Sequence, residues 1–381
     1  MATPEFRRLE RAYGFEEVAL VPGDITINPD QADINFALGG FTFPLPIIAA
    51  AMDAVVDPTL AIQFSKLGGL AALNLEGVQV RYEKPAEILT EIVQAPITRV
   101  TALLQKVYSQ AIKENLISER IEAIKKAEAS CAVSITPANT KRLAPIAEEA
   151  GADILIVQST VTTARHISKS YRGLIFSELR QLVSVPIIIG NCVSYNASLE
   201  LMRTGIDGVL VGVGPGAACT TREVLGVGVP QVTATIDCAA ARETHFKESR
   251  KYVALITDGG IRTGGDLCKA FASGADAVML GSVLAQANEA PGKGYHWGMS
   301  HPHPMLPRGT RIEVGTRAPL EQILLGPTSV TDGTENFIGA LRTAMGVCGA
   351  LTIKDMHKVQ MVIAPSIKTE GKHFQSIQSA P

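Results

Sequence analysis

The chain has 381 residues, with 35 lysines and arginines against 37 aspartates and glutamates, so its formal net charge is −2. Hydrophobic residues make up 46% of the chain and charged residues 19%, which supports a large buried core and excludes a disordered protein. The near-neutral charge, the aromatic content of 5% and the single tryptophan argue against nucleic acid as a partner, because nucleic-acid-binding proteins present basic surfaces and aromatic stacking platforms.

The cysteines and the apolar segments predict a cytoplasmic protein. No run of about 18 apolar residues occurs, so we expect no transmembrane helix and no membrane partner. Residues 1–8 lack the apolar stretch of a signal peptide. Six scattered cysteines without a Cys-x-x-Cys pair suit neither a zinc site nor a disulfide framework, so we expect reduced thiols.

Eight apolar runs predict eight buried strands, and segments of helical length separate most of them. In chain order the runs are 46–50, 70–73, 131–135, 154–157, 186–189, 209–213, 253–256 and 277–280. Three of the runs follow the same Gly-x-Asp motif, in which the glycine is expected to end a helix. The three copies are Gly151-Ala-Asp153, Gly205-Ile-Asp207 and Gly274-Ala-Asp276. Continuous apolar runs are typical of parallel strands covered on both faces. The pattern predicts a single (β/α)8 TIM barrel over residues 1–365 and a tail at 366–381, with a doubly wound sheet as the alternative.

Polar and glycine-rich loops follow the predicted strands, and in a barrel such loops carry the chemistry. Asp258-Gly-Gly260 and Gly281-Ser282 follow strands seven and eight, where barrels often hold a phosphate on backbone N–H groups. Asp258 beside such a site would suit the two hydroxyls of a ribose. These residues together predict a nucleoside monophosphate substrate, and simple turn geometry is the alternative explanation for the glycines.

Cys219 is the candidate nucleophile. It lies on a glycine-rich loop after strand six and precedes Thr220-Thr221-Arg222, whose hydroxyl and guanidinium groups can hold a thiolate. Packing is the alternative role for this thiol; Cys131 and Cys268, by contrast, have the sequence context of core residues. The Gly-Pro-Gly turn at 214–216 can present carbonyl oxygens to a monovalent cation. The turn also matches a dinucleotide fingerprint superficially, which we reject because Pro215 interrupts it and it does not lie in the first βα unit.

These residues resemble the IMP dehydrogenase/GMP reductase family. The matching motifs span roughly residues 10–365 and are Ala50-Ala-Met52-Asp53, Gly190-Asn191, Gly214-Pro-Gly-Ala-Ala-Cys219-Thr-Thr-Arg-Glu223, Gly228-Val-Pro-Gln231, Asp258-Gly-Gly260, Gly281-Ser282, Glu289-Ala-Pro-Gly292 and Gly298-Met-Ser300. The resemblance implies a TIM barrel and an oxidoreductase. In such an enzyme Cys219 would attack purine C2 to form a covalent thioimidate, and hydride would move between C2 and a nicotinamide.

The resemblance also implies a role for each matching position. Cys219 and Thr221 would be catalytic. The substrate, GMP or IMP, would contact Met52, Asn191, Asp258, Gly259, Gly260, Gly281, Ser282, Gly298, Met299, Ser300, Arg308 and Gly309. The cofactor would contact Gln158, Ser159, Thr160, Val213 and Gly214, and a potassium ion would bind at Gly214, Gly216 and Cys219 with Arg222 adjacent. Family members are tetramers or octamers, so we expect a homotetramer or a homo-octamer, with the tail reaching a neighbouring subunit's cation site.

The flap separates the two activities of the family. A dehydrogenase hydrolyses the thioimidate to XMP and uses a flap Arg-Tyr pair to activate the water, whereas a reductase forms the thioimidate from GMP, releases ammonia and reduces it to IMP. Here the flap, residues 293–318, has only six residues between Ser300 and Pro307 and contains no Arg-Tyr pair. Losing a positioned general base costs about 10²–10⁴-fold in rate. We therefore expect an NADPH-dependent GMP reductase, with NADH also possible.

Other departures from the family pattern mark a divergent branch. Family dehydrogenases usually carry CBS modules, but residues 75–130 are too few for them and are expected to form helices, as at 111–129; reductases and some dehydrogenases also lack these modules. Residues 219–222 and 226–231 look reductase-like, whereas Glu289-Ala-Pro-Gly292 looks dehydrogenase-like. Arg308 stands where reductases have a flap glutamate, Ala217 where a phosphate-binding serine is common, and Gln158 where the cofactor site has an aspartate.

Three alternatives remain at this stage. They are an IMP dehydrogenase with a substitute base, a non-catalytic purine-nucleotide sensor and, more distantly, an FMN-dependent barrel oxidoreductase. His296, His301 and His303 could be taken for a metal cluster, but prolines interrupt them and no carboxylate or thiol accompanies them. His301 or His303 could instead supply the missing acid/base group, because imidazole titrates near neutrality.

Overall fold

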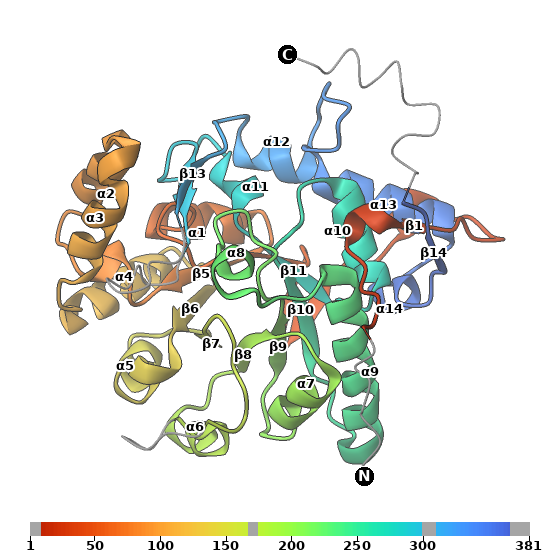
Figure 1. Cartoon of the computed structure of the whole chain (residues 1–381), viewed down its shortest axis with the longest axis horizontal. Helices are drawn as coiled ribbons and strands as arrows, with labels where there is room; N and C mark the ends of the chain where they lie inside the picture. The colour runs from red at the N-terminus through yellow and green to blue at the C-terminus, as the bar shows by residue number, and fades with distance from the viewer. Residues whose placement is uncertain (1–8, 167–173, 299–309, 366–381) are drawn as a thin grey trace, which may run out of the picture.

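The computed structural model describes residues 9–166, 174–298 and 310–365. Eight parallel strands close into a barrel, which confirms the predicted (β/α)8 fold and excludes the doubly wound sheet (Figure 1). In order around the barrel the strands are β4 (Ile47–Ala49), β5 (Leu70–Asn74), β6 (Cys131–Ile135), β7 (Ile154–Gln158), β8 (Ile187–Cys192), β9 (Gly208–Val211), β10 (Ala254–Asp258) and β11 (Ala277–Leu280). The last strand pairs with the first, with Val278 opposite Ile47.

Strand β8 extends further than the sequence predicted. The predicted apolar run ended at residue 189, but the strand continues through Asn191 and Cys192. Gly190 permits this, because a Cβ at this position would lie 2.4 Å from the Cβ of Leu210 on β9. The missing side chain lets the two backbones approach closely, so pairing continues to Cys192 with a register shift.

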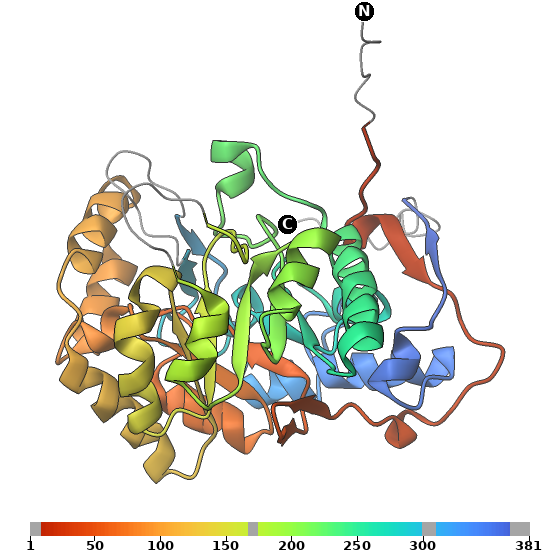
Figure 2. The same ribbon diagram turned by 90° about the horizontal axis from the view of Figure 1, so that it is seen from below.

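Helices cover the outside of the barrel (Figures 1 and 2). The longer ones are α1 (Pro58–Lys66), α2 (Pro85–Gln94), α3 (Ile97–Tyr108), α4 (Glu114–Lys126), α5 (Pro137–Glu149), α6 (Phe176–Leu182), α7 (Tyr195–Met202), α9 (Gln231–Ser249), α10 (Gly264–Ala272), α12 (Leu320–Leu325) and α13 (Phe337–Cys348). Short helices are α8 (Thr221–Leu225), α11 (Ser282–Ala285), α14 (Ile353–Met356), η1 (Phe15–Glu17), η2 (Pro29–Gln31) and η3 (Val78–Val80). The interval 75–130 is thus helical, as predicted. Within the described residues, no helix combines the length and the apolarity needed to cross a membrane.

Three pairs of short antiparallel strands flank the barrel. They are β1 (Val18–Leu20) with β14 (Met361–Ile363), β2 (Phe36–Leu38) with β3 (Phe41–Phe43), and β12 (Tyr295–Trp297) with β13 (Arg311–Glu313). The β2–β3 hairpin supplies Phe36, Leu38 and Phe43 to the core inside the barrel, where they pack against residues such as Ile156 and Leu210. One end of the barrel is therefore filled by side chains, which leaves the carboxyl ends of the strands for a site.

The Gly-x-Asp motif forms the same structure in each of its three copies. Asp153, Asp207 and Asp276 each donate a backbone N–H to the carbonyl of a residue beginning the preceding strand, namely Cys131, Ile187 and Leu255. The carboxylate of each accepts the N–H of that same residue at 2.8 Å. Each carboxylate also pairs with a cation from a helix: Lys125, Arg180 and Arg242. The repeated motif therefore aligns consecutive strands at the amino end of the barrel.

Candidate active site

Three polar side chains meet at the carboxyl ends of β7, β8 and β10. Asp258 accepts hydrogen bonds from Asn191 Nδ2 at 2.8 Å and from Gln158 Nε2 at 3.1 Å. Gln158 Nε2 also lies 3.1 Å from Asn191 Oδ1. Burial raises the pKa of the Asp258 carboxyl to about 6, although the Asn191 amide opposes the shift. Asp258 is therefore a hydrogen-bond acceptor that becomes fully charged only near neutral pH.

Gln158 keeps a second negative charge away from Asp258. Gln158 stands where the resemblance implies an aspartate, and the structure places its amide within hydrogen-bonding distance of the Asp258 carboxylate. A carboxylate here would face another carboxylate at this distance, which raises the pKa of one of the two groups. The neutral amide instead donates a hydrogen bond to the Asp258 carboxylate and so favours its charged form.

The candidate nucleophile lies on the long loop between β9 and α9. Cys219 is partly exposed, and its Sγ donates to Thr221 Oγ1 at 3.1 Å. Thr221 begins helix α8 and is buried. The Cys219 N–H donates to the Gly216 carbonyl at 2.9 Å, which closes the turn that presents the thiol. The structure thus holds a thiol beside a fixed hydroxyl, whereas Cys131 and Cys268 are buried in the core as predicted.

Arg222 fastens the rest of this loop. Its Nη2 donates to the Val229 carbonyl at 2.9 Å. A Cβ on Gly214 or Gly228 would lie 2.6 Å or 2.7 Å from the Arg222 side chain, so both glycines are needed for the close approach. Gly214 also has φ of +82°, a conformation that favours glycine. The carbonyls of residues 214–219 are therefore held in a tight, glycine-dependent turn.

The glycines after β10 and β11 face neighbouring loops of the site. A Cβ on Gly259 would lie 3.0 Å from Pro215 and 3.2 Å from the Gly216 nitrogen, so the Asp258 loop and the Cys219 loop are adjacent. Gly260 has φ of +81°. A Cβ on Gly281 would lie 2.9 Å from Met52 Sδ, and Ser282 begins the short helix α11. The predicted phosphate residues and the predicted base-contacting Met52 are thus brought together.

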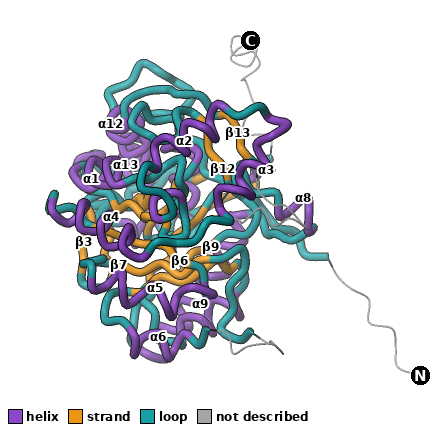
Figure 3. The backbone as a smooth tube through the Cα atoms, turned by 90° about the vertical axis from the view of Figure 1, so that its left-hand side faces the viewer, coloured by secondary structure: helices purple, strands orange, loops and turns teal. Residues whose placement is uncertain are grey.

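A cavity of about 380 Å³ lies next to Thr221. Its lining residues are Ser159, Thr160, Val161, Thr221, Leu225 and Val227. Helix α8, which carries Leu225, stands away from the barrel in Figures 2 and 3. Two predicted cofactor residues, Ser159 and Thr160, therefore line the same cavity as Thr221, which was predicted to be catalytic. The side chain of Val213 is buried instead, and it can offer only its backbone to a ligand.

Some predicted residues fall outside the described part of the chain. These are Met299, Ser300, His301, His303, Arg308 and Gly309. Gly298 is described and follows β12 directly. His296, in the same strand, is buried, and desolvation lowers the pKa of its imidazole to about 4. Among the described residues no group of three His, Cys, Asp or Glu side chains could hold a metal ion.

The sequence did not identify Tyr108, Trp297 or Arg311 as residues near the site. Tyr108 and Trp297 are buried together, and Arg311 binds backbone carbonyls of α2. Of these three residues, only Trp297 had a feature in the sequence that could have marked it as close to the site. It is the single tryptophan, and it directly precedes the motif that begins at Gly298. The position of Tyr108 in a helical segment of the chain carried no such indication.

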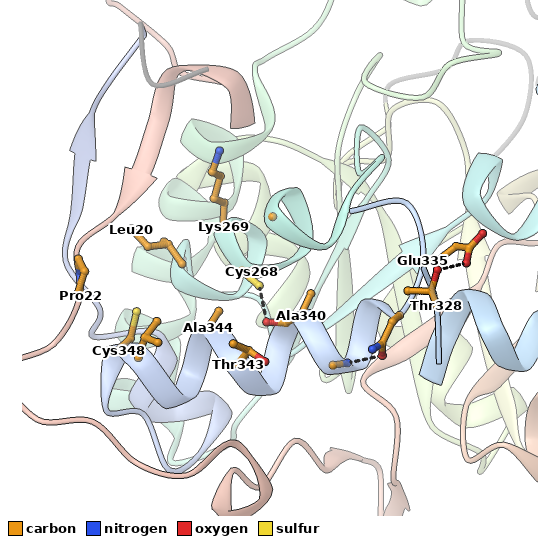
Figure 4. Close-up of a pocket in the computed structure, with 14 residues that line it drawn as sticks. Leu20, Pro22, Cys268, Lys269, Thr328, Glu335, Ala340, Thr343, Ala344 and Cys348 are labelled. Carbon is orange, nitrogen blue, oxygen red and sulfur yellow. Dashed lines mark hydrogen bonds between the residues drawn. The ribbon is translucent and has the colours of Figure 1, made fainter. Parts of the chain in front are cut away.

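A second cavity, of about 590 Å³, lies on the outside of the barrel (Figure 4). It is lined mainly by α10 and α13 and by residues that follow β1, including Cys268, Lys269, Ala340 and Cys348. None of the predicted site residues lines it. We therefore assign the candidate chemistry to the carboxyl ends of the strands and not to this groove.

Comparison with known proteins agrees with this arrangement. Residues 12–300 match the family model of the IMP dehydrogenase/GMP reductase domain. An uncharacterized oxidoreductase of Mycolicibacterium smegmatis is 36% identical over 94% of this chain and 98% of its own length. An inosine-5'-monophosphate dehydrogenase of Methanocaldococcus jannaschii is 27% identical over 95% of each chain. The crystal structure of an IMP dehydrogenase/GMP reductase-like protein from Corynebacterium glutamicum matches with a TM-score of 0.89 and 35% identity, covering 94% of this chain and 96% of that one.

Proposed function

The chain belongs to the IMP dehydrogenase/GMP reductase family of oxidoreductases, and within that family we propose that it is an NADPH-dependent GMP reductase. The observation that carries the choice is the flap. Only 13 residues, 298–310, connect the two strands of its base, and they contain no Arg-Tyr pair. A dehydrogenase needs an activated water for its last step, whereas a reductase needs none.

The proposed reaction begins at Cys219. The thiol gives up its proton, which the Thr221 hydroxyl at 3.1 Å would relay to the leaving amino group, and the sulfur adds to C2 of GMP. The C2–S bond forms, the bond from C2 to the exocyclic nitrogen breaks, and the amino group leaves as ammonia after protonation. Hydride then adds to C2, the C2–S bond breaks, IMP is released, and the Cys219 thiolate takes a proton from water to restore the thiol.

The remaining residues bind and orient the nucleotide. The charged Asp258 carboxylate would accept hydrogen bonds from the ribose hydroxyls, replacing those it now receives from Gln158 and Asn191. Backbone N–H groups at Gly260, Gly281 and Ser282 would bind the phosphate. Met52, Gly298, Met299 and Ser300 would contact the base, with Arg308 and Gly309 at the flap, and Asn191 would lie close to the reacting ring.

The cavity next to Thr221 fits a nicotinamide. Hydroxyls of Ser159, Thr160 and Thr221 can bind a carboxamide, and the aliphatic side chains of Leu225 and Val227 suit a flat ring. NADPH bound there would supply the hydride for C2. The chain's own contribution is to hold this cavity against the Cys219–Thr221 pair, with Gln158, Val213 and Gly214 nearby.

A monovalent cation, an assembly and a cytoplasmic location complete the proposal. The turn at Gly214, Gly216 and Cys219 offers neutral carbonyl oxygens, which suit potassium, and Arg222 fastens the same loop. Bound potassium would hold this turn in shape. We expect a homotetramer or a homo-octamer, as inferred from the resemblance.

A paired turnover assay tests the proposal. Purified protein with potassium is given GMP and NADPH in one reaction and IMP and NAD in the other, and the products are separated by chromatography. We expect IMP and ammonia from the first reaction and no XMP from the second. XMP from the second reaction would instead establish an IMP dehydrogenase, in which another group replaces the Arg-Tyr pair.

A further inference from the structure

Helices α2 and α3 form a hairpin that packs on the base of the flap. Figures 1 and 3 show the two helices beside β13. The hairpin shares an apolar cluster with the loop after β4 and with β12; its buried members are Ala54, Val78, Leu89, Ile92, Val100, Leu104, Val107, Tyr108 and Trp297. The hairpin therefore joins two segments that carry residues assigned to the purine base in the proposed function.

Tyr108 makes the polar connection within this cluster. Trp297 Nε1 donates to its hydroxyl oxygen at 2.7 Å, and the hydroxyl donates to Asp53 Oδ2 at 2.6 Å. Asp53 Oδ2 also accepts the Val78 N–H at 3.0 Å. Trp297 and Asp53 are each 1% exposed, and Tyr108 is 6% exposed. Buried hydrogen bonds of this kind have little competition from water, so they hold β12 and the loop after β4 at one spacing.

The second strand of the flap base is attached to the same hairpin. Arg311 on β13 donates from Nη1 to the carbonyls of Ile92 and Val93, which lie in the last turn of α2; the bond to Val93 is 2.8 Å long. Its guanidinium also lies over the Tyr295 ring, 4.8 Å from the centroid. Carbonyls at a helix end lack intrahelical partners and favour a cation, so this contact is specific. Both strands therefore take their position from the α2–α3 hairpin.

We propose that Tyr108 is a positioning residue for the purine site, acting through Asp53 on the loop that carries Met52 and through Trp297 on the strand that ends at Gly298. Met52 directly precedes Asp53 and Gly298 directly follows Trp297, so a shift at either end of the connection moves a residue assigned to the base. This assignment of the base rests on the proposed function. The connection between the two segments does not, because it is made entirely by hydrogen bonds of the chain itself.

Tyr108→Phe tests the proposal, with Tyr82→Phe as its matched control. The phenylalanine keeps the ring in the cluster but removes the acceptor of the Trp297 N–H and one of the donors to Asp53 Oδ2, which keeps its bond from the Val78 N–H. Tyr82 packs against the same cluster, and within the described part of the chain its hydroxyl donates to the Val107 carbonyl alone, at 3.1 Å. We expect Tyr108→Phe to raise the KM for GMP about fivefold and to change kcat less than threefold, because that factor corresponds to about 1 kcal/mol, the usual contribution of one buried hydrogen bond. Tyr82→Phe should leave both constants within twofold of the wild type.

Two further measurements separate positioning from a loss of folding. Trp297 is the only tryptophan, so its emission reports on β12 alone. We expect GMP to shift the emission of the wild type and of Tyr82→Phe but not that of Tyr108→Phe. Trp297→Phe removes the other end of the connection and should raise the KM by a similar factor, with no additional increase in the double variant. Additive effects, or equal KM values for Tyr108→Phe and Tyr82→Phe, would overturn the proposal.

Hydrogen exchange distinguishes a failure of this inference from a failure of the proposed function. Backbone amides of β12, β13 and residues 50–56 should exchange faster in Tyr108→Phe than in Tyr82→Phe, and this result needs no substrate. If the amides exchange faster in Tyr108→Phe but the wild type does not turn over GMP, the proposed function is wrong and the positioning role stands. If the amides exchange equally in the two variants and the wild type does turn over GMP, the positioning role is wrong and the proposed function stands.

Discussion

At the scale of single residues, Cys219 differs from the other partly exposed thiol, Cys348. The first lies 3.1 Å from a hydroxyl at the strand ends, whereas the second lies on α13 and donates to the Val21 carbonyl. We expect Cys219→Ala to abolish turnover of GMP while the nucleotide still binds, because the substitution removes the nucleophile but no binding group. Cys348→Ala should keep full turnover. Turnover that survives in Cys219→Ala would exclude the covalent route; binding without turnover in the wild type would favour a nucleotide sensor.

Asp258 gives the site a dependence on pH. Its pKa of about 6 lies above the ordinary aspartate value, so the carboxyl loses its charge as the pH falls through 6. At pH 5 about a tenth of the carboxyl groups remain charged. Because only the charged form accepts two hydroxyl hydrogen bonds, the affinity for GMP should fall about tenfold between pH 7 and pH 5.

The nucleotide phosphate also titrates near pH 6, so the measurement needs a control. Asp258→Asn cannot change its charge, and it retains the phosphate contribution. Titration calorimetry should therefore show that the affinity advantage of wild type over Asp258→Asn shrinks about tenfold from pH 7 to pH 5. A constant advantage across this range would contradict the role of the charged carboxylate.

At the scale of elements, the ion pairs of the three Gly-x-Asp turns differ in how deeply they are buried. Arg242 and Asp276 are 3% and 11% exposed, whereas Lys125 and Asp153 are 33% and 17% exposed, and Arg180 and Asp207 are 33% and 28% exposed. Tyr252 also donates to Asp276 at 2.6 Å. The geometry of the turns is the same, so differences in their energies should come from burial.

We expect Asp276→Ala to lower the free energy of unfolding by about 3–5 kcal/mol, because it removes the buried counterion of the Arg242 guanidinium and leaves it paired with the exposed Glu243 carboxylate. Asp153→Ala and Asp207→Ala should each cost about 1–2 kcal/mol, mainly for the lost hydrogen bond to the strand amide, since their cations can turn to solvent. Urea unfolding of the three variants measures how much each substitution lowers the free energy of unfolding. Equal costs at the three positions would show that burial of the ion pair is not what distinguishes them.

At the scale of the whole molecule, the buried His296 makes folding sensitive to acid. Its ring nitrogens have no hydrogen-bond partner within the described ranges, and its pKa is about 4 in the folded protein against about 6.5 in an unfolded chain. The unfolded state therefore binds a proton more readily than the folded state between these two values. The folded protein loses stability as the pH falls from 6.5 to 4, by up to about 3 kcal/mol from this residue.

His296→Phe should remove this contribution, because phenylalanine has a similar size and no titrating nitrogen. The difference in unfolding free energy between the variant and the wild type should grow by up to about 3 kcal/mol in favour of the variant from pH 7 to pH 4. The exposed His166→Phe serves as the control and should follow the wild type. Parallel curves for wild type and His296→Phe would mean that His296 is not held neutral in the folded protein.

The sequence by itself determined the barrel and singled out Cys219 as the candidate nucleophile. Eight apolar runs are local patterns, and each is long enough to specify a buried strand before any partner is known. The loop with Cys219 is likewise local, since the glycines, the thiol and Thr221 lie within eight residues of one another. Neither feature requires knowledge of which strands become neighbours.

The tertiary structure alone decided which distant side chains meet. Gln158, Asn191 and Asp258 join only because β7, β8 and β10 end at the same rim, and Gln158 thereby becomes a partner of Asp258 as well as a candidate cofactor residue. Tyr108 reaches Asp53 and Trp297 only because α2 and α3 fold back onto the flap base. These contacts span up to 189 residues of chain, and a hydrogen bond between such residues depends on packing that no local pattern encodes.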